Sequence, residues 1–433
     1  MLNVAIAGSG PAAIYAVEAL NALAPGCRVD VFERLPSPFG LVRYGVAPDH
    51  QSTKAITRKF EEVTKREGVR YFGKITIGQD LHIADLSALY DAVIIATGAP
   101  VDRELEIPGG SIPGVIGAAA FVGWYNGHPD FSQMAPDLSA GAVAVVGLGN
   151  VALDVARVLA KTGHEMAASD IADYAASTIR AAPIRDIYIV GRRGPTDAKF
   201  TPAELREIGK LSGAAPLVDS RDLAEASIEN TPVHKRTVIE RNLNLMRAFS
   251  KEAARSKPIK IHFRFFSKPE QVLGSEIVTG LTIRRTKVTE DRLIDTEITE
   301  TIPCGLIVSA IGYRSNTIPG LPFDLPSGRF RHENGRIAPG VFTVGWAGRG
   351  SSGTIASNKI DAENIAKRIV AEIEPLRPAS RGDIEALMAS RGLKWITYAD
   401  WMRIDRRETE TAVAPQPRSK LTSINEMINV LHE

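Results

Sequence analysis

Two stretches of the sequence decide the fold: LNVAIAGSGPAAIYAVEAL at residues 2–20 and AVAVVGLGNVALDVARVLA at residues 142–160. Each begins with a β-branched or apolar run of the kind found in a strand that is buried on both faces. Each continues with the pattern G-x-G-x-x-A and a helix rich in Ala, Leu and Val. Because this order of strand, glycine turn and helix is typical of dinucleotide-binding units, the two stretches predict two nucleotide domains.

The first glycine turn is expected to bind a dinucleotide. Gly8 allows the chain to turn tightly, and Gly10 lets a pyrophosphate approach the backbone N–H groups at the helix start, where the dipole favours negative charge. A second strand at residues 29–33 ends in Glu33, where the hydroxyl groups of an adenosine ribose need a carboxylate. A glycine turn alone can be incidental, but the complete order of strand, turn, helix, strand and acid predicts dinucleotide binding.

The second turn carries the same glycines, Gly147 and Gly149, but its following strand ends differently. Residues 187–190 lead into GRR at residues 191–193, where the first domain has Glu33. A carboxylate would repel the 2′-phosphate of NADP, whereas two guanidinium groups offer it forked, charge-assisted hydrogen bonds. The second site is therefore expected to prefer NADP over NAD. An exposed basic pair at a strand end is the simpler alternative.

Further apolar runs place the later strands. The runs at residues 91–96 and 305–310 look like matching late strands, one in each domain. Residues 340–345 predict a strand that leads into a Gly/Ser loop and a helix over about 354–373. These elements complete two similar nucleotide domains.

The remaining pattern sets the domain organisation. Residues 258–302 alternate apolar and polar residues and predict antiparallel strands, and residues 413–420 predict a surface loop. The predicted fold is α/β, with two doubly wound Rossmann-like nucleotide-binding domains. Residues 1–104 and 328–433 form a discontinuous first domain, and the second domain, residues 105–327, is inserted in it.

The composition fits a globular protein of more than one domain. The chain has 433 residues, too many for a single hydrophobic core, with 44% hydrophobic and 24% charged residues. The net charge of +2 gives no case for nucleic acid or a membrane as partner.

The two cysteines, Cys27 and Cys304, form no CxxC pair. Neither a disulfide framework nor a metal centre is therefore expected, and a reducing cytoplasm fits. Because the first strand begins at once, no cleavable leader is expected, and no apolar run suits a bilayer helix.

Longer motifs carry a family resemblance. They are PSPFGLVRYGVAPDH at 36–50, GLGNVALDVAR at 147–157, GRRGP at 191–195, FTPAELRE at 200–207, GWAGRGSSGTI at 345–355 and WMRID at 401–405. On these motifs, which span essentially the whole chain, it resembles the adrenodoxin-reductase-like ferredoxin–NADP reductases, including their bacterial members. Two departures are small: Ser351-Ser352 stands where a Pro-Thr pair is expected, and Leu148 replaces a polar residue.

The resemblance implies roles for individual residues. FAD would bind in the first domain and NADP(H) in the second, with Trp346 and the backbone after it holding the flavin ring and the helix dipole near Thr354 stabilising reduced flavin. His50 and Asp154 match family positions near the flavin that relay a proton, and Glu204 matches a carboxylate at the nicotinamide end. The FAD residues would be Gly8, Gly10, Pro11, Ala12, Glu33, Gly40, Leu41, Val46, Trp346, Gly353, Thr354 and Ile355; the NADP residues would be Gly147, Gly149, Asn150, Val151, Arg192, Arg193, Glu204 and Gly353.

The same resemblance implies the reaction and the partner. Hydride transfer between NADPH and the flavin, followed by single-electron transfer to a ferredoxin, would make the protein an FAD-dependent ferredoxin–NADP(+) reductase. Ferredoxins are acidic, so a basic docking face is expected, although a solvated basic helix face is an equal alternative. The protein is expected to act as a monomer in the cytoplasm. Docking candidates are His234, Lys235, Arg236, Arg241, Lys251, Arg255 and Lys257.

The residues also bear on three other interpretations of the two turns. A thioredoxin-reductase-like enzyme needs a redox dithiol, and the sequence has no CxxC. An NADPH-dependent electron-input component, similar to the glutamate synthase small subunit, usually carries cysteines for iron–sulfur clusters. The two distant cysteines of this sequence cannot hold such a cluster. A non-catalytic nucleotide sensor needs no flavin ring site, which Trp346 and its loop indicate. Simpler roles stay open at three positions: a core aromatic for Trp346, a solvated helix residue for Glu204 and a structural hydrogen-bonding residue for His50.

Overall fold

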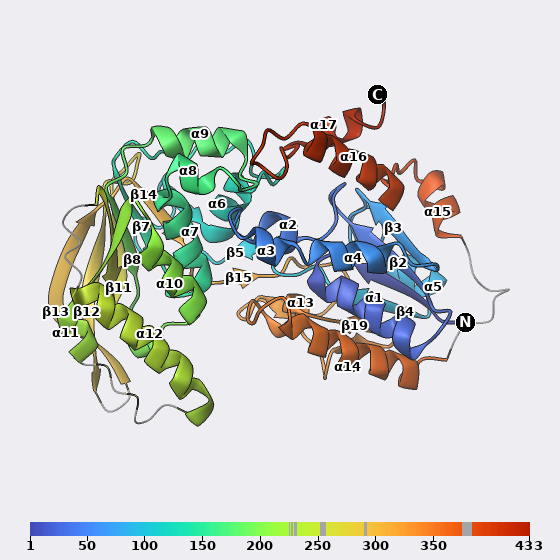
Figure 1. Cartoon of the computed structure of the whole chain (residues 1–433). Coiled ribbons are helices and arrows are strands. Elements are labelled where there is room, and N and C mark those ends of the chain that lie inside the picture. Colours follow the sequence, from blue (N-terminus) through green and yellow to red (C-terminus); the bar gives the residue numbers. More distant parts are fainter. Residues whose placement is uncertain (225, 227, 229–231, 252–256, 290–291, 375–382) are drawn as a thin grey trace. The chain divides into compact units, whose positions relative to one another are not determined.

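The computed structural model describes residues 1–224, 226, 228, 232–251, 257–289, 292–374 and 383–433 (Figure 1). The chain forms two compact units: the first comprises Met1–Val101, Asn126–Asp130 and Gly312–Glu433, and the second comprises Asp102–Tyr125 and Phe131–Ile311. Along the sequence, the second unit therefore interrupts the first. The domain limits predicted after residues 104 and 327 stand as predictions, while the compact units divide after Val101 and Ile311.

The first unit is built on a six-stranded sheet with the strand order β18-β19-β4-β1-β2-β3. Its neighbouring strands pair in parallel, except β18 with β19. The sheet consists of β1 (Asn3–Ala7), β2 (Arg28–Glu33), β3 (Val69–Gly73), β4 (Ala92–Ile95), β18 (Arg336–Ala338) and β19 (Val341–Thr343).

Two cores lie on opposite faces of this sheet because successive side chains of a strand point to opposite faces. On one face, Val4 and Ile6 pack with the helices α1 (Pro11–Leu23) and α14 (Ser357–Glu372), which lie side by side (Figure 1). On the other face, Ala5 and Ala7 pack with a second cluster that includes α15 (Ile384–Ser390). The continuous apolar run in β1 thus reflects burial on both faces, as predicted.

The C-terminal tail is fixed to the first unit by buried charges. Glu408 of α16 (Tyr398–Glu410) is fully buried and accepts a hydrogen bond of 2.9 Å from Arg43. Lys420 donates to the carbonyl oxygens of Arg43 at 3.3 Å and Asn126 at 3.0 Å. Residues 413–420 form a loop, as predicted, but their predicted surface position is wrong for Lys420, which is 8% exposed. Its ammonium group tolerates burial because interior carbonyl groups accept its hydrogen bonds.

The shorter elements of the first unit connect these parts. They are α2 (Leu41–Tyr44), α3 (Gln51–Lys54), α4 (Thr57–Thr64), α5 (Ile83–Leu89), β15 (Tyr313–Arg314), β16 (Phe323–Asp324), β17 (Arg329–Phe330), α13 (Trp346–Arg349) and α17 (Ile424–Asn429). The strand β5 (Val101–Asp102) lies at the division between the units.

The second unit repeats this architecture. Its six-stranded sheet has the order β6-β14-β7-β8-β10-β9, and its neighbouring strands pair in parallel. The strands are β6 (Val115–Gly117), β7 (Ala142–Val146), β8 (Asp186–Val190), β9 (Ala214–Val218), β10 (Ile259–Arg264) and β14 (Leu306–Ser309).

Helices and a small antiparallel sheet complete the second unit. The helices are α6 (Ala118–Tyr125), α7 (Asn150–Ala160), α8 (Gly163–Met166), α9 (Asp173–Ala181), the 3₁₀ turn η1 (Pro195–Asp197), α10 (Pro202–Lys210), α11 (Ser220–Ala224) and α12 (Val233–Lys251). The antiparallel strands are β11 (Ser267–Leu273), β12 (Gly280–Thr289) and β13 (Arg292–Pro303). Within the described residues, no helix combines the length and apolar character needed to cross a membrane.

The prediction for residues 258–302 is correct for β11–β13 and wrong for β10. Strand β10 lies between β8 and β9 in the parallel sheet. Its alternation of apolar and polar residues imitates a half-exposed antiparallel strand. The parallel sheet accepts this alternation because His262 stacks on Tyr188 with ring centroids 4.5 Å apart and lies 2.7 Å from a carboxylate oxygen of Asp186. One face of this part of the sheet therefore carries polar groups.

Candidate functional site

The first glycine turn joins β1 to α1 in a conformation that requires glycine. Gly8 has φ +103°, and a Cβ atom there would clash with the carbonyl oxygen of Ala96. Its N–H donates to the carbonyl oxygen of Phe32 at 2.7 Å, which fixes the turn to the end of β2. Among the described residues, none comes within 4 Å of a Cβ atom built on Gly10, and no side chain caps the start of α1. This open space beside uncapped N–H groups fits a pyrophosphate.

Two distant motifs meet at this turn. A Cβ atom on Gly40 would lie 3.2 Å from the Cα atom of Gly10, so the 36–50 motif lies directly against the turn. A Cβ atom on Gly345 would lie 2.6 Å from the Cβ atom of Ala12, so the 345–355 motif touches the first helical turn. Three segments that are far apart in sequence therefore surround one cradle at the carboxyl end of β1.

Glu33 is fixed at the end of β2. Its Oε2 atom accepts hydrogen bonds from the backbone N–H of Ser9 at 3.1 Å and from the Ser9 hydroxyl at 2.6 Å. Its Oε1 atom accepts from the N–H of Leu35 at 3.2 Å. A carboxylate held in this way at the strand tip suits the hydroxyl groups of a ribose. No role was predicted for Ser9, although this residue lies inside the first glycine motif.

The predicted flavin loop is held rigidly within the first unit. Trp346 donates its indole N–H to the carbonyl oxygen of Ser352 at 2.9 Å and stacks with Tyr313 at a centroid distance of 6.1 Å. Arg349 donates to the Ser357 hydroxyl and to the Asn358 side-chain oxygen, both at 3.1 Å. These contacts anchor the loop to the start of α14.

One detail differs from the sequence expectation for this loop. The helix was expected to begin near Thr354, whereas α14 begins at Ser357, because residues 354–356 form a turn and the hydroxyl of Ser357 donates to the carbonyl of Thr354. Gly353 and Thr354 are exposed and Ile355 is half-buried. In the 36–50 motif, Leu41 is 41% exposed and Val46 is half-buried, so both side chains are accessible to a ligand.

The second glycine turn has the same backbone design. Gly147 has φ +144°, a Cβ atom there would clash with the carbonyl oxygen of Ala310, and its N–H donates to Val190 at 2.9 Å. Within the described part of the chain, nothing lies within 4 Å of a Cβ atom on Gly149, and no side chain caps α7. Asn150, the first helical residue, accepts a hydrogen bond from the N–H of Thr201 at 2.8 Å, and the half-buried Val151 follows it.

The strand tip after the second turn carries the predicted basic pair. Phe32 and Val190 both bind the first glycine of their turn, so Gly191 occupies the place of Glu33. A Cβ atom on Gly191 would clash with the side chain of Leu148. The next two residues, Arg192 and Arg193, are exposed, and Arg193 forms an ion pair of 3.2 Å with Asp197.

Two predicted carboxylates of the second unit come together. Asp154 of α7 and Glu204 of α10 contact the same nitrogen, Nη1 of Arg157, at 2.8 and 3.1 Å. Glu207 lies one helical turn after Glu204, and its carboxylate is 3.8 Å from Nε of Arg157. No role was predicted for Arg157 or Glu207, although each lies three residues from a predicted carboxylate, on the same face of its helix.

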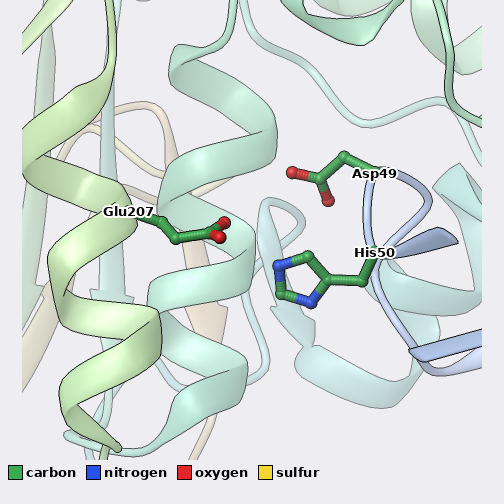
Figure 2. Close-up of side chains that lie close together, drawn as sticks. All are labelled: Asp49, His50 and Glu207. Atoms are coloured by element: carbon green, nitrogen blue, oxygen red, sulfur yellow. The ribbon is translucent and has the colours of Figure 1, made fainter. Parts of the chain in front are cut away.

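Figure 2 shows the side chains of Asp49 and His50 on the loop that enters α3, and that of Glu207 on α10. The half-buried His50 is fixed through its backbone: its N–H donates to Ala47 and its carbonyl oxygen accepts from Thr53, both at 3.0 Å. His50 belongs to the first unit, whereas Asp154 and Glu204 belong to the second. The proton relay assigned to His50 and Asp154 stays a prediction.

The cysteines offer no redox dithiol. Cys27 lies in the first unit and Cys304 in the second, and both are free and buried. Burial raises the pKa of Cys27 to about 11 and that of Cys304 to about 12. Both are therefore neutral thiols near pH 7, unsuited to thiol–disulfide chemistry.

Two dinucleotide-type turns, one facing a carboxylate and one followed by a guanidinium pair, indicate an α/β oxidoreductase of the nucleotide-binding type. The family model described as pyridine nucleotide-disulphide oxidoreductase matches residues 2–345, and the chain belongs to this family. The predicted fold class is confirmed by this match and by a solved structure of Mycobacterium tuberculosis FprA in complex with NADPH, which has a TM-score of 0.93, 36% sequence identity and coverage of 100% of both chains.

Two curated relatives are similar over nearly the whole chain. NADPH-ferredoxin reductase FprA of Mycobacterium tuberculosis is 38% identical over 450 residues, which cover 99% of this chain and 98% of that protein. Human mitochondrial NADPH:adrenodoxin oxidoreductase is 36% identical over 453 residues, which cover 99% of this chain and 92% of that protein. The resemblance to adrenodoxin-reductase-like enzymes, inferred from motifs, is thereby confirmed.

Proposed function

We propose that this protein is an FAD-dependent ferredoxin–NADP(+) reductase that transfers electrons between NADPH and a ferredoxin. The observation that carries the proposal is the difference between two otherwise equal turns: Glu33 at one strand tip, and Gly191 followed by Arg192 and Arg193 at the other. The names of the similar proteins, NADPH-ferredoxin reductase and NADPH:adrenodoxin oxidoreductase, support the same reaction.

The first unit would hold FAD. The uncapped start of α1 would bind the pyrophosphate, and Glu33 would bind the adenosine ribose. When bound, FAD supplies the ability to exchange two electrons with a nicotinamide and one at a time with an iron–sulfur protein. Trp346 and the loop behind it would position the ring. The proposed FAD residues are Gly8, Gly10, Pro11, Ala12, Glu33, Gly40, Leu41, Val46, Trp346, Gly353, Thr354 and Ile355.

The second unit would hold NADP(H). The start of α7 would bind the pyrophosphate, and the exposed guanidinium groups of Arg192 and Arg193 would bind the 2′-phosphate. Glu204 would contact the nicotinamide end, and His50 and Asp154 would relay a proton. The proposed NADP residues are Gly147, Gly149, Asn150, Val151, Arg192, Arg193 and Glu204, with Gly353 from the first unit.

The ferredoxin would dock on the exposed basic side chains of α12. Lys235, Arg236 and Arg241 are exposed on this helix, as are His234 and Lys251. Lys257 is a weaker candidate because it is half-buried and donates to the carbonyl oxygen of Leu211 at 2.6 Å, and Arg255 lies outside the described residues. A monomeric protein in the cytoplasm completes the proposal.

An anaerobic titration tests the reaction. The purified protein is expected to be yellow, to bleach with NADPH in the absence of air, and to bleach far more slowly with NADH. Adding a ferredoxin should then accelerate NADPH-dependent reduction of cytochrome c. A colourless protein would remove the whole proposal. Bleaching without any acceleration by ferredoxins would remove only the partner and favour an electron-input component that serves a tightly bound subunit.

Charge reversal tests the docking face. We expect the KM for ferredoxin to rise by about tenfold or more at low salt when Lys235→Glu, Arg236→Glu and Arg241→Glu are combined. Charged residues at the edge of an interface mainly change the rate at which the two proteins associate. Ferricyanide reduction by NADPH should not change. Arg180→Glu, an exposed arginine on α9, is the matched control. An unchanged KM in the triple variant would place the docking face elsewhere.

A further inference from the structure

Arg157 is a cation buried without contact to solvent. It lies on α7, three residues after Asp154, and its side chain is 0% exposed. Removing a guanidinium group from water costs several kcal/mol unless nearby carboxylates and hydrogen bonds offset the loss. A dinucleotide turn does not need such a residue, because the phosphate cradle is made by backbone N–H groups.

The contacts of Arg157 give the reason for its position. Its Nη1 atom lies 2.8 Å from Oδ1 of Asp154 and 3.1 Å from Oε2 of Glu204, so one nitrogen faces two carboxylates. Its Nε atom lies 3.8 Å from Oε2 of Glu207. The side chains of Asp154, Glu204 and Glu207 are 17%, 21% and 43% exposed, so the cation forms the buried base of a partly accessible carboxylate cluster.

The two helices bring these residues together through local rules. Asp154 and Arg157 share one face of α7, and Glu204 and Glu207 share one face of α10, because residues three apart are neighbours on a helix. The helices pack against each other, and their starts are joined by the hydrogen bond from the N–H of Thr201 to Asn150. Three carboxylates this close would repel one another without a cation between them.

We propose that Arg157 is a positioning residue for the reaction of NADPH: it holds the carboxylates of Asp154 and Glu204 in one fixed arrangement. The inference rests on the proposed function, in which Glu204 contacts the nicotinamide end and Asp154 relays a proton. An arginine suits this task because its planar fork faces several carboxylates along different directions, whereas a lysine ammonium is a single point. Arg157 itself need not touch the coenzyme, since its side chain is fully buried.

The first test compares Arg157→Lys with the wild type. The variant keeps the positive charge, so it should fold, retain FAD and bind NADP(H) within about threefold of the wild type, because the phosphates are held elsewhere. Anaerobic stopped-flow reduction of the flavin at saturating NADPH should slow by about 10- to 100-fold, the usual cost of misplaced reacting groups. The loss should therefore fall on the maximal rate and not on the KM. Arg284→Lys is the matched control, since Arg284 also pairs with a carboxylate, Glu270, in the same unit.

A double-variant cycle separates positioning from stability. If Arg157 acts through Glu204, the losses caused by Arg157→Lys and Glu204→Gln should not add in the double variant. Additive losses, or a variant Arg157→Lys that reduces its flavin at the wild-type rate, would overturn the inference. If the wild type itself is not reduced by NADPH, the proposed function fails instead. Thermal unfolding of each variant, with Arg157→Gln as the more disruptive change, reports stability independently of the rate.

Discussion

The two glycine turns share one backbone and differ at two side chains. Gly8 and Gly147 both have positive φ angles and both lie against a backbone carbonyl oxygen, and Gly10 and Gly149 both face open space within the described structure. In the first turn the middle residue, Ser9, donates to Glu33 at the strand tip. In the second turn the middle residue, Leu148, packs over Gly191.

This difference shows how one frame can serve two nucleotides. The glycines set the path of the chain and leave the helix start free for a pyrophosphate, which both FAD and NADP contain. The residue at the strand tip then meets the adenosine ribose. A carboxylate there accepts hydrogen bonds from free ribose hydroxyl groups, whereas removing it makes room for a phosphate that guanidinium groups can hold.

The largest expected effect comes from replacing the first glycine of each turn with alanine. Gly8→Ala should leave the purified protein colourless, whereas Gly147→Ala should keep FAD and bleach with NADPH at least about 100-fold more slowly. In both variants a Cβ atom would strike a carbonyl, and the backbone conformation alone costs about 1–3 kcal/mol. Flavin absorbance per protein and stopped-flow reduction measure the two outcomes.

Gly163→Ala is the control for these glycine variants, because a Cβ atom there meets nothing within 4 Å in the described part of the chain. The comparison of the two turns breaks if Gly147→Ala loses its flavin as readily as Gly8→Ala does.

The next effect concerns the guanidinium pair. Replacing both Arg192 and Arg193 with Ala should raise the KM for NADPH by about 10- to 100-fold, since hydrogen bonds between charged groups contribute about 1.5–3 kcal/mol each. The KM for NADH should hardly change, because NADH lacks the 2′-phosphate. Of the two single variants, Arg193→Ala should raise the KM for NADPH less than Arg192→Ala, because Arg193 already forms an ion pair with Asp197. Steady-state kinetics with each coenzyme measure these KM values. An equal rise of the KM for NADPH and for NADH would contradict the binding of the 2′-phosphate by this pair.

A smaller effect is expected when the second unit is given the counterparts of Glu33 and Ser9 from the first unit. Gly191→Glu alone should destabilise the second unit, because its Cβ atom would clash with Leu148. Adding Leu148→Ser should relieve the clash and create the partner that Ser9 provides for Glu33. The double variant should discriminate against NADPH relative to NADH by about tenfold compared with the wild type, through repulsion of the 2′-phosphate. If Gly191→Glu alone folds as well as the double variant, the packing of Leu148 is not what keeps this position a glycine.

The last effect concerns the stability of the first unit in acid. Burial lowers the pKa of His128, in the first unit, to about 4; the guanidinium groups of Arg34 and Arg43 act in the same direction and Asp130 opposes them. An unfolded histidine has a pKa near 6.5. As the pH falls from about 6.5 to 4, the unfolded state therefore binds a proton at this histidine while the folded state does not. The free energy of unfolding falls by on the order of 2 kcal/mol over this range. His128→Gln should lose less stability over this range. Urea unfolding at pH 7 and pH 5, followed by flavin release, measures the difference, and equal losses in both proteins would exclude His128 as the cause.

Much of the fold follows from local sequence because the signals for each nucleotide turn lie within one continuous segment of the chain. The first strand (Asn3–Ala7), its turn at Gly8 and the acid Glu33 lie within about thirty residues, and the second strand (Ala142–Val146), its turn at Gly147 and the basic tip at Arg193 lie within about fifty. A strand followed by a glycine turn and a helix has few ways to satisfy its backbone groups. The family model and the similar structure confirm the fold that these signals predict.

The candidate site could be predicted only in part. The residues of each turn were identified, but the contacts that organise them were not: Ser9 on Glu33, Leu148 on Gly191, and Arg157 beneath Asp154 and Glu204. Each of these contacts depends on which face a side chain presents after the elements pack. The sequence contains the residues but not the pairing.

By itself, then, the sequence determined the two nucleotide turns and the charge that follows each of them, since glycine conformations and strand-tip residues act over short distances. Only the tertiary structure decided that Gly40 and Gly345 lie against the first turn, that β10 joins the parallel sheet, and that Lys420 is buried. The physical reason is that burial and long-range packing depend on residues tens to hundreds of positions apart. Their free energies are settled by the whole assembled core and not by any one segment.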